Sequence, residues 1–172
     1  FASETSVQRN AGPPEKGQLH IGAASVLMKG AYTARLSRQE LLRAINNLAT
    51  NLHLWGQDCD KRLKHLVEYV YHNVEDAQIG FIGDKLEDCH LALFTDADFA
   101  GDRKDNKSTS GVFLVLLGPS TFFPIGAISK KQGATSQSST GAEIIACNCG
   151  LKTLGIPSLE LWELISGKTQ VV

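Results

Sequence analysis

The clearest pattern in the chain is an apolar stripe at helical spacing between residues 58 and 74. Its apolar side chains recur three or four positions apart, at Leu63, Leu66, Val67, Val70, Tyr71 and Val74. This spacing places them on one face of an amphipathic helix. Another apolar run, over 41–52, follows Ser37 and Glu40, whose separation is typical of a capping box at a helix start. We predict a helix from Ser37 and a second over 58–74, packed as a hairpin around Gly56.

The pattern changes from helical to short, strand-like runs after residue 77. We predict strands over 78–83, 91–95, 111–117 and 125–130, with a polar loop over 101–110. A helix over 140–154 follows, and then another that has Pro157 in its first turn and Gly167 as its C-terminal cap. The final residues, 169–172, have the composition of a strand that is beginning.

Residues 1–30 show neither periodicity. They include the adjacent prolines Pro13 and Pro14, several glycines and few large apolar side chains. Such a segment buries too little apolar surface to offset the entropy lost on ordering. We therefore expect a flexible arm over 1–30.

Composition and charge exclude several classes of protein. The 172 residues are 42% hydrophobic and 20% charged, which is ordinary for a globular domain and excludes collagen, coiled coil and whole-chain disorder. Seventeen basic residues against 18 acidic ones give a net charge of −1, so the overall charge does not by itself indicate binding to nucleic acid or a membrane surface. The longest apolar run, 112–117, is far shorter than the roughly 20 residues of a membrane span.

The four cysteines and the identity of the first residue each lead to a further expectation. Cys59, Cys89, Cys147 and Cys149 match neither a disulfide framework nor a CxxC pair, so free thiols are favoured over a zinc site. The chain begins with Phe1, and its one methionine is Met28. We expect a processed product, a piece of a longer polypeptide or an incomplete chain.

Acidic residues concentrate between positions 84 and 105, and two of them offer a metal site. Asp96 and Asp98 close a predicted strand, where residues two apart lie on one face. Neighbouring carboxylates repel each other unless a cation intervenes, and Mg²⁺ commonly takes one or two carboxylates with waters and substrate phosphate. A solvated acidic loop is the alternative interpretation.

Glu143 is the one acidic residue between positions 106 and 159, and it falls in the first turn of a predicted helix. It could serve as a metal ligand. It could equally cap the helix, because Thr140 and Glu143 have capping-box spacing and an acid in the first turn complements the helix dipole. Spacing alone does not separate these roles.

Four sequence blocks resemble, in order and spacing, the ribonuclease H region of copia-type retrotransposon Pol polyproteins. The blocks are 94–102 (FTDADFAGD), 107–111 (KSTSG), 128–132 (ISKKQ) and 138–143 (SSTGAE). Upstream, 41–51 and 60–83 resemble the segment that connects reverse transcriptase to ribonuclease H in such polyproteins. The resemblance covers roughly residues 25–172 and leaves the arm over 1–30 unassigned. It implies a helical connection segment over 31–76 and a partial ribonuclease H-like domain over 77–172.

The resemblance also implies a fold and a chemistry. The expected fold is α/β, a ribonuclease H-like mixed sheet with flanking helices, truncated at its C-terminal end and preceded by a helical hairpin. Ribonucleases H cleave the RNA strand of an RNA–DNA hybrid with two Mg²⁺ ions, which activate the attacking water and stabilise the leaving oxygen. Asp96 and Glu143 would be the catalytic carboxylates and metal ligands. Asp98 would be a further metal ligand, although its position is usually not the primary one in this family.

Lys130 and Lys131 would contact nucleic-acid phosphate, where a point charge suffices. A solvated pair of surface lysines is the alternative. One block departs from the family pattern, because Gly141 stands where a glutamate is common.

The family's third and fourth carboxylates have no counterpart by motif in this sequence. We therefore expect a retroelement ribonuclease H remnant or fragment that is inactive as this chain. The alternative is a domesticated or processed structural subunit, in which a protein partner covers the open sheet edge within a larger assembly.

Overall fold

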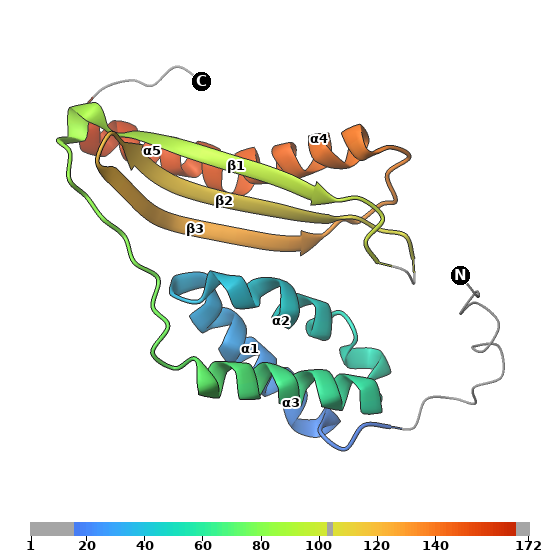
Figure 1. Ribbon diagram of the computed structural model, residues 1–172. Helices are drawn as coiled ribbons and strands as arrows, with labels where there is room; N and C mark the ends of the chain where they lie inside the picture. Colours follow the sequence, from blue (N-terminus) through green and yellow to red (C-terminus); the bar gives the residue numbers. More distant parts are fainter. Residues whose placement is uncertain (1–15, 103–104, 168–172) are drawn as a thin grey trace, which may run out of the picture.

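The computed structural model describes residues 16–102 and 105–167, which form three layers (Figure 1). A central three-stranded sheet carries the helices α1, α2 and α3 on one face and α4 and α5 on the other. The arrangement is mixed α/β with an open antiparallel sheet and flanking helices. No helix within these residues is long and apolar enough to cross a membrane.

The first layer consists of three helices joined by short 3₁₀ turns. The helices are α1 (His20–Leu36), α2 (Leu42–Ala49) and α3 (Gln57–His72), and the turns are η2 (Gln39–Leu41) and η3 (Leu52–Leu54). Their facing sides bury an apolar core that includes Leu27, Ile45, Leu48, Trp55 and Leu63. The helix predicted over 58–74 corresponds to α3, and its predicted start is confirmed, because α3 begins at Gln57.

The expected arm over 1–30 is wrong for its last part, because α1 begins at His20. Ala23, Leu27 and Ala34 of this helix lie on one face and are buried. Gly30 is a packing position, since a Cβ there would lie 3.3 Å from Ile45 of α2. Gly30, one of the glycines that suggested a loose segment, thus allows close contact between α1 and α2. Residues 1–15 lie outside the described residues.

The capping box predicted at Ser37 is also wrong. Ser37 terminates α1, and its hydroxyl donates to the carbonyl of Thr33 at 3.4 Å. Glu40 accepts a hydrogen bond from the side chain of Arg38 instead of capping a helix. The layer is therefore a three-helix cluster rather than a hairpin.

The sheet has the strand order β1-β2-β3 and is antiparallel throughout the described residues. Its strands are β1 (His90–Asp98), β2 (Thr109–Gly118) and β3 (Thr121–Lys131), with a bulge between Leu114 and Val115. These confirm three of the predicted strands. The predicted strand over 78–83 is wrong, because this segment contributes only a bridge between Phe81 and Phe122.

The last layer is one nearly continuous helical run. It comprises α4 (Ser139–Gly150), a π-helical turn η5 (Leu151–Gly155) and α5 (Ile156–Ser166); the short 3₁₀ turn η4 (Leu86–Asp88) precedes β1. Gly167 caps α5 in the left-handed conformation, with φ of 67°, as its position predicted. The strand predicted over 169–172 lies outside the described residues.

Side-chain alternation along β1 separates the two helical layers. Leu93 and Thr95 point toward α4, where a Cβ on Gly150 would lie 2.9 Å from Thr95 and 3.4 Å from Leu93. The even-numbered residues of β1, Asp96 and Asp98 among them, therefore face the α1–α3 layer. Alternation along β1 therefore places the carboxylates of Asp96 and Asp98 on the side of the sheet that faces α1–α3.

Candidate functional site

Asp96 and Asp98 lie two residues apart on β1 and share one face of the sheet. Asp98 forms an ion pair with Arg43 of α2, which shows that this face meets the first helical layer. The carboxylate of Asp98 also lies against Gly101, where a Cβ would approach within 2.1 Å of it. Asp98 is thus already neutralised and enclosed, whereas Asp96 is exposed to solvent.

Glu143 is half-buried near the start of α4 but beyond its first turn, across the sheet from the α1–α3 layer. The helix cap is Ser138 rather than Thr140, since the Ser138 hydroxyl accepts a hydrogen bond from the Gly141 backbone at 3.0 Å. The predicted capping box between Thr140 and Glu143 is therefore not the cap that this helix uses. Glu143 therefore does not cap α4.

Glu143 lies on the flank of α4 that borders β1. The inward row of α4 consists of Ala142, Ala146 and Gly150, all of them buried. At 100° per residue, Cys149 and Glu143 lie on opposite sides of this row. Cys149 borders the β3 side of the sheet, because it lines a cleft with β3 residues. Glu143 consequently points toward β1.

The three predicted metal ligands do not form a ready metal cage. Within residues 16–102 and 105–167, no group of three or more His, Cys, Asp or Glu side chains is placed to hold a metal ion. Asp96 faces the α1–α3 layer, whereas Glu143 lies on α4, across the sheet from it. A metal shared by these two carboxylates would have to lie at the edge of β1 and complete its coordination with water.

The two predicted phosphate-binding lysines have different environments. Lys131 forms ion pairs with Asp102 at 2.5 Å and Asp105 at 2.9 Å. The hydrogen bonds to these carboxylates raise the pKa of Lys131, and the bond from Lys131 lowers the pKa of Asp105. Lys130 is exposed and has no acidic partner among the described residues. Lys131 therefore holds the loop after β1, whereas Lys130 is available to a ligand.

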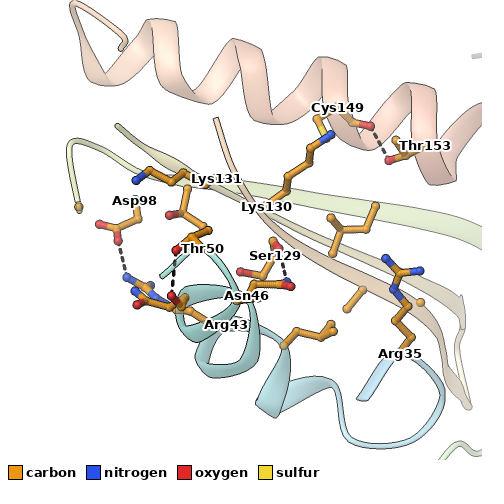
Figure 2. A pocket seen from close by; sticks show the side chains of 18 of the residues that line it. Arg35, Arg43, Asn46, Thr50, Asp98, Ser129, Lys130, Lys131, Cys149 and Thr153 are labelled. Atoms are coloured by element: carbon orange, nitrogen blue, oxygen red, sulfur yellow. Dashed lines mark hydrogen bonds and ion pairs between the residues drawn. The ribbon is translucent and has the colours of Figure 1, made fainter. Parts of the chain in front are cut away.

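Lys130 and Lys131 line a cleft that is shown in Figure 2. Its volume is about 910 Å³, and it lies along the outer edge of β3, between α2 and the α4–η5 segment. Asn46 of α2 donates a hydrogen bond to the Ser129 carbonyl at 2.6 Å, so a side chain from the helical layer satisfies an acceptor of β3. Further cations in the wall are Arg35 and Arg43.

No sequence pattern predicts this cleft. Arg35 belongs to α1, whose start was expected to be a loose arm, and Arg43 and Asn46 are ordinary polar positions of an amphipathic helix. Gln132 was also missed as an individual residue, although it is buried between β3 and α4. Its amide donates to the Ser110 hydroxyl at 3.0 Å and to the Ala142 carbonyl at 2.9 Å. It fixes the start of α4, and hence Glu143, relative to the sheet.

The cysteines are all free, as predicted. Cys59 and Cys89 are buried among apolar side chains, and Cys147 and Cys149 lie on α4.

Comparison with known proteins places the chain beside retroelement polyproteins. It is similar to the retrovirus-related Pol polyproteins from transposons RE2 and RE1 of Arabidopsis thaliana, with 35% and 33% identity over 107 residues. These residues are 62% of this chain, which spans only 7% of each polyprotein. No protein-family profile matches the chain, and no solved structure matches it. The similarity supports a retroelement-derived segment.

Proposed function

We propose that this chain derives from the ribonuclease H region of a retroelement Pol polyprotein and keeps two of the carboxylates of its two-metal site. The observation that carries the proposal is the similarity to two Pol polyproteins over 107 residues. The order of four motif blocks, from 94–102 to 138–143, supports the ribonuclease H region as the source of the chain.

Asp96 and Glu143 are the metal ligands of this proposal. Asp96 lies on β1, an outer strand of the described sheet, and Glu143 lies on α4, on the opposite face of that sheet. The proposed cation lies at the free edge of β1, between these two faces. Asp96 is exposed, and the cap formed by Ser138 leaves the Glu143 carboxylate free for a cation. We leave Asp98 out of the proposed metal site, because its carboxylate is already paired with Arg43.

When bound, Mg²⁺ would activate a water for attack on the RNA phosphodiester and stabilise the leaving oxygen. The chain's own contribution is to hold two carboxylates on rigid elements, one in a strand and one in a helix capped at its start. The rate depends strongly on where the reacting groups are held, since a misplacement of about 1 Å can lower it about 100-fold. Two protein ligands constrain an ion poorly, so we propose that the chain alone does not turn over RNA–DNA hybrid.

A hybrid-cleavage assay tests this proposal. The chain is incubated with a labelled RNA–DNA hybrid in Mg²⁺ beside the variants Asp96→Asn and Glu143→Gln, with Asp98→Asn as the matched control. We expect cleavage by the wild-type chain at the level of the Asp96→Asn background. Robust cleavage that survives Asp96→Asn would contradict the assignment of the site.

A second function, as an interaction subunit of a larger assembly, is favoured by the surface of α5. Leu161, Leu164 and Ile165 of this helix are exposed, Leu164 by 82%. Contiguous exposed apolar side chains of this kind mark interaction surfaces or aggregation sites. We expect the isolated chain to self-associate in sedimentation velocity and Leu164→Glu to reduce this. A monomer at all concentrations would count against this function.

A further inference from the structure

The cleft along β3 has a charge that contrasts with the chain as a whole. Four cationic side chains line it, namely Arg35, Arg43, Lys130 and Lys131, against the two acids Asp98 and Asp102. The wall therefore carries an excess of two positive charges in a chain whose net charge is −1. A cleft that gathers one sign of charge concentrates ligands of the opposite sign.

The acids in the wall are already paired, and this decides which cations are available. Arg43 is paired with Asp98, and Lys131 with Asp102 and with Asp105, which lies outside the wall. Arg35 and Lys130 are exposed and have no ion-pair partner within the described residues. These two side chains come from different layers, α1 and β3, and Figure 2 shows them lying apart rather than converging on one point.

The remainder of the wall limits what kind of anion fits. Amide and hydroxyl groups of Asn46, Asn47 and Thr50 supply neutral polar groups, and Ile125 and Leu154 supply apolar surface. Among the described residues that line the cleft, none is aromatic. Aromatic side chains are the usual platforms for stacking bases, so this wall suits a sugar–phosphate backbone better than a base.

We propose that the cleft between α2 and β3 binds the phosphodiester backbone of a single nucleic-acid strand, with Arg35 and Lys130 contacting separate phosphates. Two cations that lie apart suit successive phosphates better than one isolated anion. Binding is independent of base sequence and depends strongly on salt. The inference rests on the proposed function for its choice of nucleic acid over other polyanions, and it adds the helical layer to the binding surface.

Fluorescence anisotropy with labelled oligo(dT) and oligo(dC), titrated with the full chain over a range of salt concentrations in EDTA, tests the inference. Arg35→Gln and Lys130→Gln should each weaken binding about 3- to 10-fold and reduce the slope of log affinity against log salt by about 0.7, the value for one phosphate contact on a single strand. The double variant should lose both contacts. Arg35→Lys should keep the slope, because it keeps the charge.

Lys61→Gln is the matched control, since it removes one charge from α3, outside the cleft. An equal loss in Lys61→Gln, or an unchanged slope in both cleft variants, would overturn the inference. Competition by polyglutamate or inorganic phosphate as effective as that of an unlabelled oligonucleotide would also overturn it. Arg35 and Lys130 are exposed, so we expect circular dichroism spectra like that of the wild type.

Because EDTA removes divalent cations, oligonucleotide binding measured in EDTA tests the cleft separately from the proposed metal site. If Asp96→Asn loses metal binding but still binds oligonucleotide, the inference about the cleft stands independently of the metal site. If the cleft variants bind oligonucleotide as the wild type does while metal binding at Asp96 and Glu143 is intact, the cleft inference is wrong and the proposed metal site stands.

Discussion

At the scale of single residues, the carboxylate of Asp60 is the best-satisfied buried acid in the described structure. It accepts hydrogen bonds from the Trp55 indole at 2.7 Å and from the backbone of Gln18 at 2.6 Å and Leu19 at 3.1 Å. These bonds tie the start of α1 to the first turn of α3. Burial opposes the charge, but the donors outweigh it and lower the pKa of Asp60 below its ordinary value.

This lowered pKa predicts a loss of stability in acid. A carboxyl group whose pKa is lower in the folded state stabilises the fold above its unfolded pKa of about 3.9. That contribution disappears as the pH falls through the folded pKa. We expect the free energy of unfolding to decline below about pH 4 and Asp60→Asn to flatten this decline while being less stable at pH 7. Urea unfolding at several pH values checks this, and an equal decline in wild type and variant would contradict it.

At the scale of elements, two helical glycines have opposite surroundings. Gly150 of α4 lies against the sheet, where an added Cβ would be 2.9 Å from Thr95 and 3.0 Å from Val112. Gly22 of α1 has open space around the same position. Close packing of α4 on β1 and β2 thus depends on one missing side chain.

The substitutions Gly22→Ala and Gly150→Ala should therefore have different effects. Alanine is favoured over glycine inside a helix by about 1 kcal/mol, so Gly22→Ala should stabilise by up to that amount. Gly150→Ala has the same helical gain but overpacks the interface, which typically costs about 1–3 kcal/mol. Chemical denaturation compares the two variants. Equal stabilisation by both would show that α4 does not pack on the sheet as described.

The elements also show which sequence signals were reliable. Residues 91–95, 111–117 and 125–130 were recognised as strands because each combines β-branched or long apolar residues with turn residues at both ends. The α1 helix was missed because its buried face consists of Ala23, Leu27 and Ala34, so that only one large apolar side chain marks it, while Ile21 and Met28 are exposed. Ser37 was misread because a capping-box spacing does not reveal whether its hydroxyl binds a following N–H or a preceding carbonyl.

At the scale of the whole molecule, two contacts of unequal strength join the first helical layer to the sheet. Asn46 donates to the Ser129 carbonyl, and both groups are half-buried. The ion pair between Arg43 and Asp98 is open to solvent on the arginine side. An exposed pair contributes about 0–1 kcal/mol, whereas a lost hydrogen bond that leaves a buried acceptor unsatisfied costs about 1–3 kcal/mol.

We therefore expect Asn46→Ala to lower the free energy of unfolding more than Arg43→Ala does. Thermal melts at low and high salt check the ranking, because only the Arg43 contribution should decrease with salt. A larger effect for Arg43→Ala at high salt would contradict it.

The candidate site was only partly predictable at this scale. The sequence placed Asp96 and Asp98 on one strand and Glu143 at a helix start, and those elements are present. It could not show that Arg43 neutralises Asp98, because 55 residues separate the pair and only the packing of α2 on the sheet brings them together. It could not show the β3 cleft for the same reason, since α1, α2, β3 and α4 all contribute to its wall.

The central claim is that Asp96 and Glu143 bind a divalent cation together at the edge of β1. Titration of Mn²⁺ into the isotope-labelled chain, followed by paramagnetic broadening of backbone amide signals, tests this most directly. The account predicts selective broadening around 95–97 and 141–144 that disappears in both Asp96→Asn and Glu143→Gln. Broadening confined to the acids around Asp102 and Asp105, or unchanged by these substitutions, would contradict it.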